Sequence, residues 1–152
     1  MNLTFFGVDG FEKYRPVLQS LVGNVGDRNV IQFTYAINEA ICNALCYGDG
    51  GFEMSKVKLR IRCNSKFIIA KVSSSSPGFD VHTYINNLGN DYPDWCKALR
   101  NKNRGRGIWI MLTGSEKVIF NSNGKDVILV SRISECPENQ ERELLSKIAI
   151  RK

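Results

Sequence analysis

Apolar and polar residues alternate in patterns that change along the chain and predict short strands and helices. Residues 2–8 are typical of a short strand that Asp9-Gly10 ends, and residues 11–21 have the apolar spacing of a helix. Asp27 suits the N-cap of a long helix that runs to about Tyr47 before a glycine-rich stretch ends it. The first third therefore predicts a strand, a helix and a longer helix.

Strict alternation begins near residue 57. Apolar residues at every second position of 57–63 predict a half-buried strand, and a turn at 64–65 leads into the mostly apolar run 67–72. Residues 73–78 are expected to form a loop, and residues 80–104 form the least regular segment. After it we expect a helix from the glycine turn at 105–107 to Gly114, a hairpin of 118–121 with 127–133 around Asn123-Gly124, and a terminal helix over 137–152.

Composition is that of one globular domain. The chain has 152 residues, of which 43% are hydrophobic and 24% charged, and no apolar run approaches the roughly 20 residues that span a bilayer. The opening residues do not resemble a signal peptide. Five cysteines form no compact framework, which favours a reducing compartment and predicts a cytoplasmic protein without a membrane partner.

The net charge of +6 suits nucleotide phosphates, an acidic protein partner or nucleic acid. Part of the excess alternates along the strand at 57–63, where it is typical of a solvated sheet face. The rest lies close to the glycine turn at 105–107. These residues are Lys97, Arg100, Lys102, Arg104 and Arg106.

The long helix has two chemically different sides. Val30, Ile37, Ile41 and Ala44 cluster on one side and predict a core face. Glu39 and Asn43 lie almost opposite, near Gln32, Ala36 and Cys46. A Glu and an Asn four residues apart present one acid and one amide to a common ligand, and an exposed helix face is the alternative interpretation.

Three segments resemble the boxes of the GHKL ATPase superfamily, specifically its anti-sigma-factor serine kinases. Residues 38–48 resemble the N-box, Glu-Ala-x-x-Asn-Ala followed by His-Gly, with Tyr47 in place of the histidine. Residues 72–80 look like the first glycine box, and residues 105–111 look like the second. The likeness covers about residues 9–133.

The resemblance implies an α/β chain, more closely an α+β two-layer sandwich of the Bergerat type. Its mixed, mostly antiparallel sheet carries helices on one face. Residues 1–135 would form the ATP-binding domain, and residues 136–152 a C-terminal helical extension of it.

The resemblance also implies roles for individual residues toward ATP and Mg²⁺. Glu39 would be the catalytic general base, and Asn43 would ligate the metal. Ser74 and Gly78 would lie in the adenine pocket, and residues 81–104 would form the lid. The phosphates would be bound by backbone amides and basic side chains at Arg104, Gly105, Arg106, Gly107 and Ile108, with Lys102 as a further cation.

The first glycine box departs from the family pattern at two positions. Ser74 stands where the family has the aspartate that accepts the adenine amino group, and Ser76 stands where it has a glycine. Loss of such a charge-assisted contact costs on the order of 1.5–3 kcal/mol, or roughly ten- to a hundredfold in affinity.

Two functions follow from the resemblance, and a third from the charge. The first is an ATP-binding regulatory protein that phosphorylates or sequesters a sigma-factor-like or antagonist-like partner and could form a homodimer. The second is a non-catalytic protein-binding module with a decayed pocket. Nucleic-acid binding is the weakest of the three. A zinc site at Cys42 and Cys46 is disfavoured, because no second ligand pair has suitable spacing.

Overall fold

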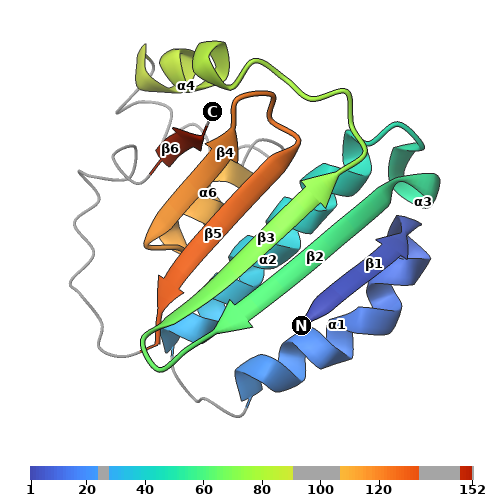
Figure 1. Ribbon diagram of the computed structural model, residues 1–152, viewed down its shortest axis with the longest axis vertical. Helices are drawn as coiled ribbons and strands as arrows, with labels where there is room; N and C mark the ends of the chain where they lie inside the picture. The colour runs from blue at the N-terminus through green and yellow to red at the C-terminus, as the bar shows by residue number, and fades with distance from the viewer. Residues whose placement is uncertain (24–27, 91–106, 134–147, 152) are drawn as a thin grey trace.

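The computed structural model describes residues 1–23, 28–90, 107–133 and 148–151, and its centre is a six-stranded sheet (Figure 1). The strand order is β1-β2-β3-β5-β4-β6. Neighbouring strands are antiparallel except β4 and β6, which are parallel. The strands are β1 (Asn2–Phe6), β2 (Lys56–Cys63), β3 (Phe67–Ser74), β4 (Lys117–Asn121), β5 (Asp126–Arg132) and β6 (Ile148–Arg151).

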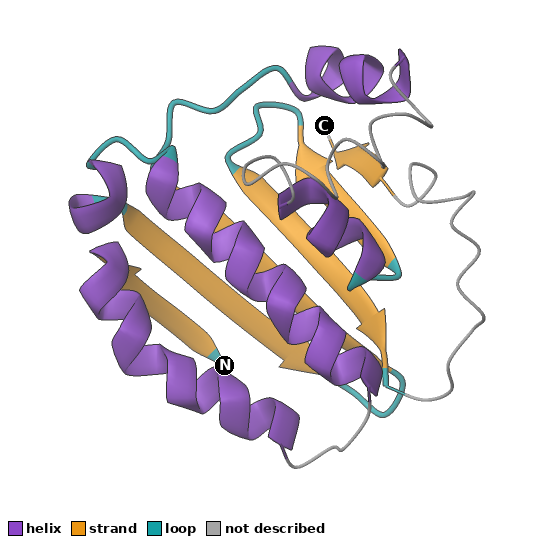
Figure 2. Cartoon of the chain, turned by 180° about the vertical axis from the view of Figure 1, so that it is seen from behind, coloured by secondary structure: helices purple, strands orange, loops and turns teal. Residues whose placement is uncertain are grey.

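Helices α1, α2 and α6 cover one face of this sheet, as the view from behind shows (Figure 2). The described helices are α1 (Gly7–Gly23), α2 (Arg28–Cys46), α3 (Gly51–Met54), α4 (Val81–Asn90) and α6 (Gly107–Thr113). This arrangement confirms the predicted two-layer fold with a mixed, mostly antiparallel sheet. Within the described ranges, no helix is both long and apolar enough to cross a bilayer.

The core lies between the helices and the inward side chains of the sheet. Strand register places Leu59 beside Val72, and Ala70 beside Leu129, on this inner face. Against them pack Phe33, Ile37 and other apolar residues of α2. Since successive strand residues point to opposite faces, the basic residues of β2 point away from the helices.

Two sequence predictions are wrong at the ends of elements. Asp9-Gly10 does not end the first strand. The strand ends at Phe6, and both residues lie inside α1, which begins at Gly7. A Cβ on Gly10 would lie 3.0 Å from Phe5 Cβ, so the glycine lets α1 pack against β1. Ile148–Arg151 form a strand rather than the end of a helix. The alternating Ile148 and Ile150 pack against the core, which explains the strand.

Other predictions fare differently along the chain. The long helix, the strands at 57–63 and 67–72 and the hairpin around Gly124 are confirmed. The N-cap at Asp27, the part of the irregular segment from residue 91 on and the helix before residue 148 lie outside the described residues.

Candidate functional site

Helix α2 presents Glu39 and Asn43 on the side that faces α6. Both side chains are half-buried rather than freely exposed. The predicted core side is confirmed, because Ile37 is 4% exposed and Ile41 is fully buried. Ala36, expected on the polar side, is fully buried as well. The polar side of α2 is therefore a second contact surface, against α6.

Helix α6 packs closely along α2 in the opposite direction. A Cβ on Gly114, which follows α6, would lie 2.4 Å from the Gln32 carbonyl oxygen and 3.0 Å from Ala36 Cβ. At its other end, Gly107 lies beside Glu39 and Asn43. Two glycines thus permit the close approach that places the start of α6 against the acid and the amide. The resemblance to the family boxes placed Gly107 in one site with Glu39 and Asn43. Nothing in the sequence indicated the contact of Gly114 with α2.

The start of α6 lies close against the polar pair, because Gly107 has no side chain that would separate them. A Cβ on Gly107 would lie 3.0 Å from Glu39 Oε2, 3.2 Å from Asn43 Nδ2 and 3.6 Å from Asn43 Oδ1. One carboxylate and one amide oxygen are hard ligands of the kind that Mg²⁺ accepts alongside phosphate oxygens and waters. The residues present therefore fit a magnesium nucleotide.

Ser74 lies at the end of β3, where its hydroxyl joins the strand to α2. Its Oγ donates to the Ala44 carbonyl oxygen at 3.1 Å and accepts the Ser76 backbone N–H at 3.0 Å. Ala44 directly follows Asn43, so Ser74 is close in the fold to the polar pair. A hydroxyl has one proton and two lone pairs, so one acceptor position remains for a ligand.

Gly78 fixes the loop that follows Ser74 against the β4–β5 turn. Its φ is +91°, and a Cβ there would lie 2.0 Å from the Asn123 carbonyl oxygen. The next residue, Phe79, donates its backbone N–H to that same oxygen at 2.9 Å. Phe79 also packs edge-on against Phe120 and Tyr84, with ring centroids 6.0 and 5.5 Å apart. The glycine is therefore required by both its backbone angle and its neighbour.

Asp80 caps the helix that begins the predicted lid. Its carboxylate accepts the Thr83 backbone N–H at 3.1 Å and the Thr83 hydroxyl at 2.7 Å. These hydrogen bonds, the hydroxyl's first, hold the pKa of Asp80 below its usual range. Residues 81–90 form α4, and the rest of the predicted lid lies outside the described residues.

Tyr84 on α4 packs edge-on against Phe79, in the loop that follows Gly78. Burial raises the pKa of Tyr84, and the nearby Tyr47 raises it further. Tyr47, at the position of the family histidine, is 74% exposed.

Cys42 is not an activated nucleophile. Burial raises the pKa of its thiol, and the neighbouring Glu39 carboxylate raises it further. The thiol therefore stays protonated near neutral pH. Across the described ranges, no three His, Cys, Asp or Glu side chains converge as metal ligands.

The predicted phosphate-binding residues are only partly described. Gly107 begins α6, and Ile108 is a buried core residue at 5% exposure, so its contribution to a ligand is limited to its backbone amide. Arg104, Gly105 and Arg106 lie outside the described residues, as does Lys102.

Comparison with known families agrees with this arrangement. No curated protein matches the chain in sequence. The family described as "Histidine kinase-like ATPase domain" matches residues 12–131, which include the Glu39–Asn43 pair, Ser74, Gly78 and Gly107. The match covers most of the chain, including β2, β3, β4 and nearly all of β5, whereas β1 and β6 lie outside it. The chain therefore belongs to the histidine kinase-like ATPase domain family, within the GHKL type of ATP-binding domains.

Proposed function

We propose that the protein binds Mg²⁺-ATP beside the start of α6 and regulates a partner protein, as anti-sigma-factor serine/threonine kinases do. The observation that carries this proposal is the contact of Gly107 with both Glu39 and Asn43. This contact brings the start of α6 against the acid and the amide of α2, and all three residues lie within the family-matched region.

The residues have complementary tasks in this proposal. Asn43 would hold Mg²⁺ through its amide oxygen, and bound Mg²⁺ would neutralise charge on the phosphates. Glu39 would accept the proton of a serine or threonine hydroxyl of the partner while that oxygen takes the γ-phosphoryl group. ADP is the leaving group, and Gly107 leaves the space in which the phosphates approach α2.

The partner is expected to be a regulatory protein resembling a sigma factor or its antagonist. Binding of such a partner would also regulate it by sequestration alone, without any transfer of phosphate. Cytoplasmic location belongs to the same proposal, since it rests on the cysteine usage of the chain.

One observation favours a second candidate, a protein-binding module with weakened nucleotide binding. The Ser74 hydroxyl is already bonded to Ala44 and Ser76. It offers an adenine amino group one uncharged lone pair where the resembling kinases offer a carboxylate. The acid and the amide at Gly107 support the first candidate, so we place it ahead.

Calorimetric titration of the purified chain with ATP and Mg²⁺ tests the proposal. We expect binding in the micromolar range that weakens by more than about tenfold in Asn43→Ala, because the metal loses a ligand. Glu39→Ala should retain binding but lose phosphoryl transfer to a partner. Tyr35→Ala, an exposed position on the same helix, serves as the control.

The two candidates give different results in this titration. Binding that depends on Asn43 but not on Tyr35 supports the first candidate. A folded protein that releases no heat up to millimolar nucleotide, with or without Mg²⁺, rejects it and favours the protein-binding module.

A further inference from the structure

The sheet face opposite α2 and α6 is turned toward the viewer in Figure 1. It carries a row of basic residues beside a strip of aliphatic ones. The outward side chains of β2 are all basic and exposed. They are Lys56, Lys58, Arg60 and Arg62. Strand register places Arg62 beside Ile69, and Ile69 beside Val130. Ile119 and Ile128, which are paired in register, continue the half-buried aliphatic strip.

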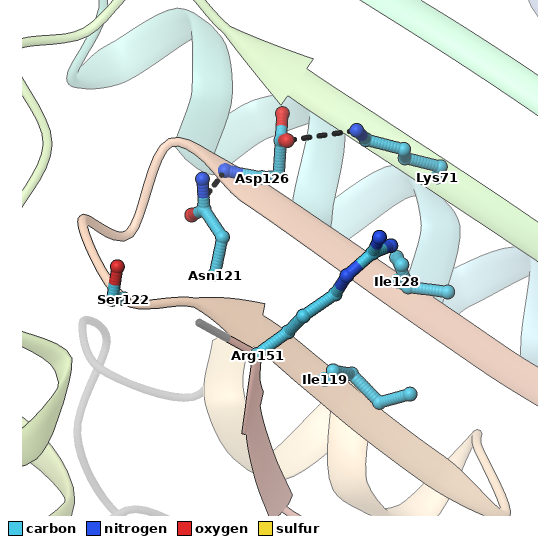
Figure 3. Close-up of a pocket in the computed structure, with 7 residues that line it drawn as sticks. All are labelled: Lys71, Ile119, Asn121, Ser122, Asp126, Ile128 and Arg151. Carbon is cyan, nitrogen blue, oxygen red and sulfur yellow. Dashed lines mark hydrogen bonds and ion pairs between the residues drawn. The ribbon is translucent and has the colours of Figure 1, made fainter.

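A hollow of about 300 Å³ lies at one end of this strip (Figure 3). Ile119 and Ile128 line it together with polar residues of β3, β4, β5 and β6. Lys71 Nζ lies 2.7 Å from Asp126 Oδ2, so these two charges satisfy each other. Arg151 extends across β4 toward Ile128 without a direct carboxylate partner among the described residues (Figure 3). The hollow therefore holds two cations, Lys71 and Arg151, around the single carboxylate of Asp126, which leaves an excess of positive charge.

The charges of this face are strongly unequal. Two basic side chains on its described strands form ion pairs. Lys71 pairs with Asp126, and Arg132 pairs with Glu116. The other basic side chains have no carboxylate within ion-pair distance in the described residues. These are Lys56, Lys58, Arg60, Arg62, Lys117 and Arg151. The face is thus a cationic surface with an aliphatic middle.

Charge argues against a second copy of the chain as the occupant. A two-fold contact places the same patch on both sides, so cationic rows would oppose one another. Juxtaposed like charges disfavour such a pair. The placement of the rings argues against nucleic acid, since single-stranded bases bind by stacking on rings. The middle of the face is aliphatic, and the rings of Phe6 and Phe67 at its edges already have cations over them, Lys56 Nζ at 5.6 Å and Arg132 Cζ at 5.5 Å from the ring centroids.

We propose that this face docks an acidic, aliphatic segment of a partner protein. Its carboxylates would bind the β2 row and Arg151, and its apolar side chains would cover Ile69, Ile128 and Val130. The surface lies on the opposite side of the sheet from Glu39 and Asn43. The inference is therefore independent of nucleotide binding and stands even where the proposed kinase activity fails.

Fluorescence anisotropy with synthetic peptides and the full chain tests the proposal. The probe is a labelled peptide of repeated Glu-Glu-Leu-Leu units, compared with repeated Lys-Lys-Leu-Leu and Glu-Glu-Ser-Ser. We expect the first to bind most tightly, and Arg60→Glu with Arg62→Glu to weaken it roughly tenfold or more. Lys13→Glu with Arg15→Glu on α1 gives the same net charge change on the helical side and should weaken it far less.

Four results would overturn the proposal. Equal weakening by the two charge-reversed pairs would show attraction to net charge rather than to this face. Equal binding of the Glu-Glu-Ser-Ser peptide would remove the role of the aliphatic strip. Tighter binding of a single-stranded oligonucleotide, or a dimer in sedimentation that the Arg60→Glu and Arg62→Glu pair dissociates, would identify a different occupant. Circular dichroism of each variant establishes that it is folded.

Discussion

The start of α6 and the end of β3 lie on either side of one candidate site, and they differ in what they leave available. At α6, Gly107 lies against Glu39 and Asn43, which are half-buried and so remain partly accessible to a ligand. At β3, the Ser74 hydroxyl is engaged by Ala44 and Ser76 within the protein. The residues suited to phosphate and metal binding are thus present, while the residue expected to bind adenine differs from the family pattern. Substitutions on the two sides should therefore change ATP affinity and protein stability independently.

The largest effect is expected at Gly78, in the loop that follows Ser74 on the adenine side of the candidate site. Gly78→Ala combines a φ of +91° with a Cβ only 2.0 Å from a backbone oxygen, so we expect about 3 kcal/mol or more of destabilisation. Gly51→Ala is the matched control, because its φ is +63° but nothing lies within 4 Å. It should cost about 1 kcal/mol. Urea unfolding of both variants measures the difference.

Equal losses in the two variants would mean that backbone angle alone determines the cost. The contact of Gly78 with the β4–β5 turn would then contribute nothing to stability.

The next effect is expected at Gly107, on the phosphate side. Gly107→Ala introduces a methyl group 3.0 Å from Glu39 Oε2, which is the end of a flexible side chain and can move. Stability should change by less than about 1 kcal/mol, whereas ATP affinity should fall at least about tenfold. Calorimetric titration and urea unfolding measure the two quantities on the same protein.

Gly114→Ala supplies the opposite pattern on the same helix contact. Its Cβ would lie 2.4 Å from the Gln32 carbonyl oxygen, which cannot move without shifting α2. We expect about 2 kcal/mol of destabilisation from this overpacking, with unchanged ATP affinity in the folded fraction. A Gly107→Ala protein with unchanged affinity would show that the nucleotide does not approach this glycine.

A smaller effect is expected from restoring the carboxylate on the base side. Ser74→Asp should raise ATP affinity roughly tenfold, because a charged acceptor replaces a neutral one. It should also lose about 1 kcal/mol of stability, since a carboxylate cannot donate to the Ala44 oxygen. Ser74→Ala is the control and should lose stability without gaining affinity. Unchanged affinity in a folded Ser74→Asp protein would place base recognition elsewhere.

Periodicity and turn chemistry predicted most of the fold, because local patterns agreed with tertiary packing. The alternation at 57–63 and the Asn123-Gly124 turn both gave the observed strands. Gly10 was misread as a breaker, because its role depends on Phe5, which packs against it from a different element. The end of the chain was misread because its charge gradient suggests a helix, whereas Ile148 and Ile150 complete a sheet.

The candidate site was predictable only in part, for a related physical reason. Resemblance to known boxes indicated Glu39, Asn43 and Gly107. The four-residue spacing of Glu39 and Asn43 placed these two on one side of the long helix. The bond from Ser74 to Ala44 was not predictable, since it joins a strand and a helix far apart in sequence. The buried state of Ala36 was missed because nothing in the sequence of α2 shows that α6 packs against its polar side.

The smallest expected effect concerns the other face of the sheet and tests whether it is independent of the candidate site. Burial raises the pKa of Asp126, but hydrogen bonds from Lys71 and Ser73, with the charges of Lys71 and Arg151, outweigh it and lower the pKa overall. A lowered pKa in the folded state stabilises the protein above the unfolded value of about 3.9. That contribution is lost as pH falls through the lower, folded value.

Asp126→Asn should therefore reduce the free energy of unfolding near neutral pH by less than about 1 kcal/mol, since the pair is partly exposed and screened by solvent. The difference between variant and wild type should shrink as pH falls below about 4. ATP affinity should stay unchanged, because Asp126 points away from the face that carries Glu39 and Asn43. Urea unfolding across pH measures the first effect and calorimetry the second. A loss of stability that is the same at every pH would show that the Asp126 side chain acts through uncharged contacts, such as its hydrogen bond with Ser73, rather than through charge pairing.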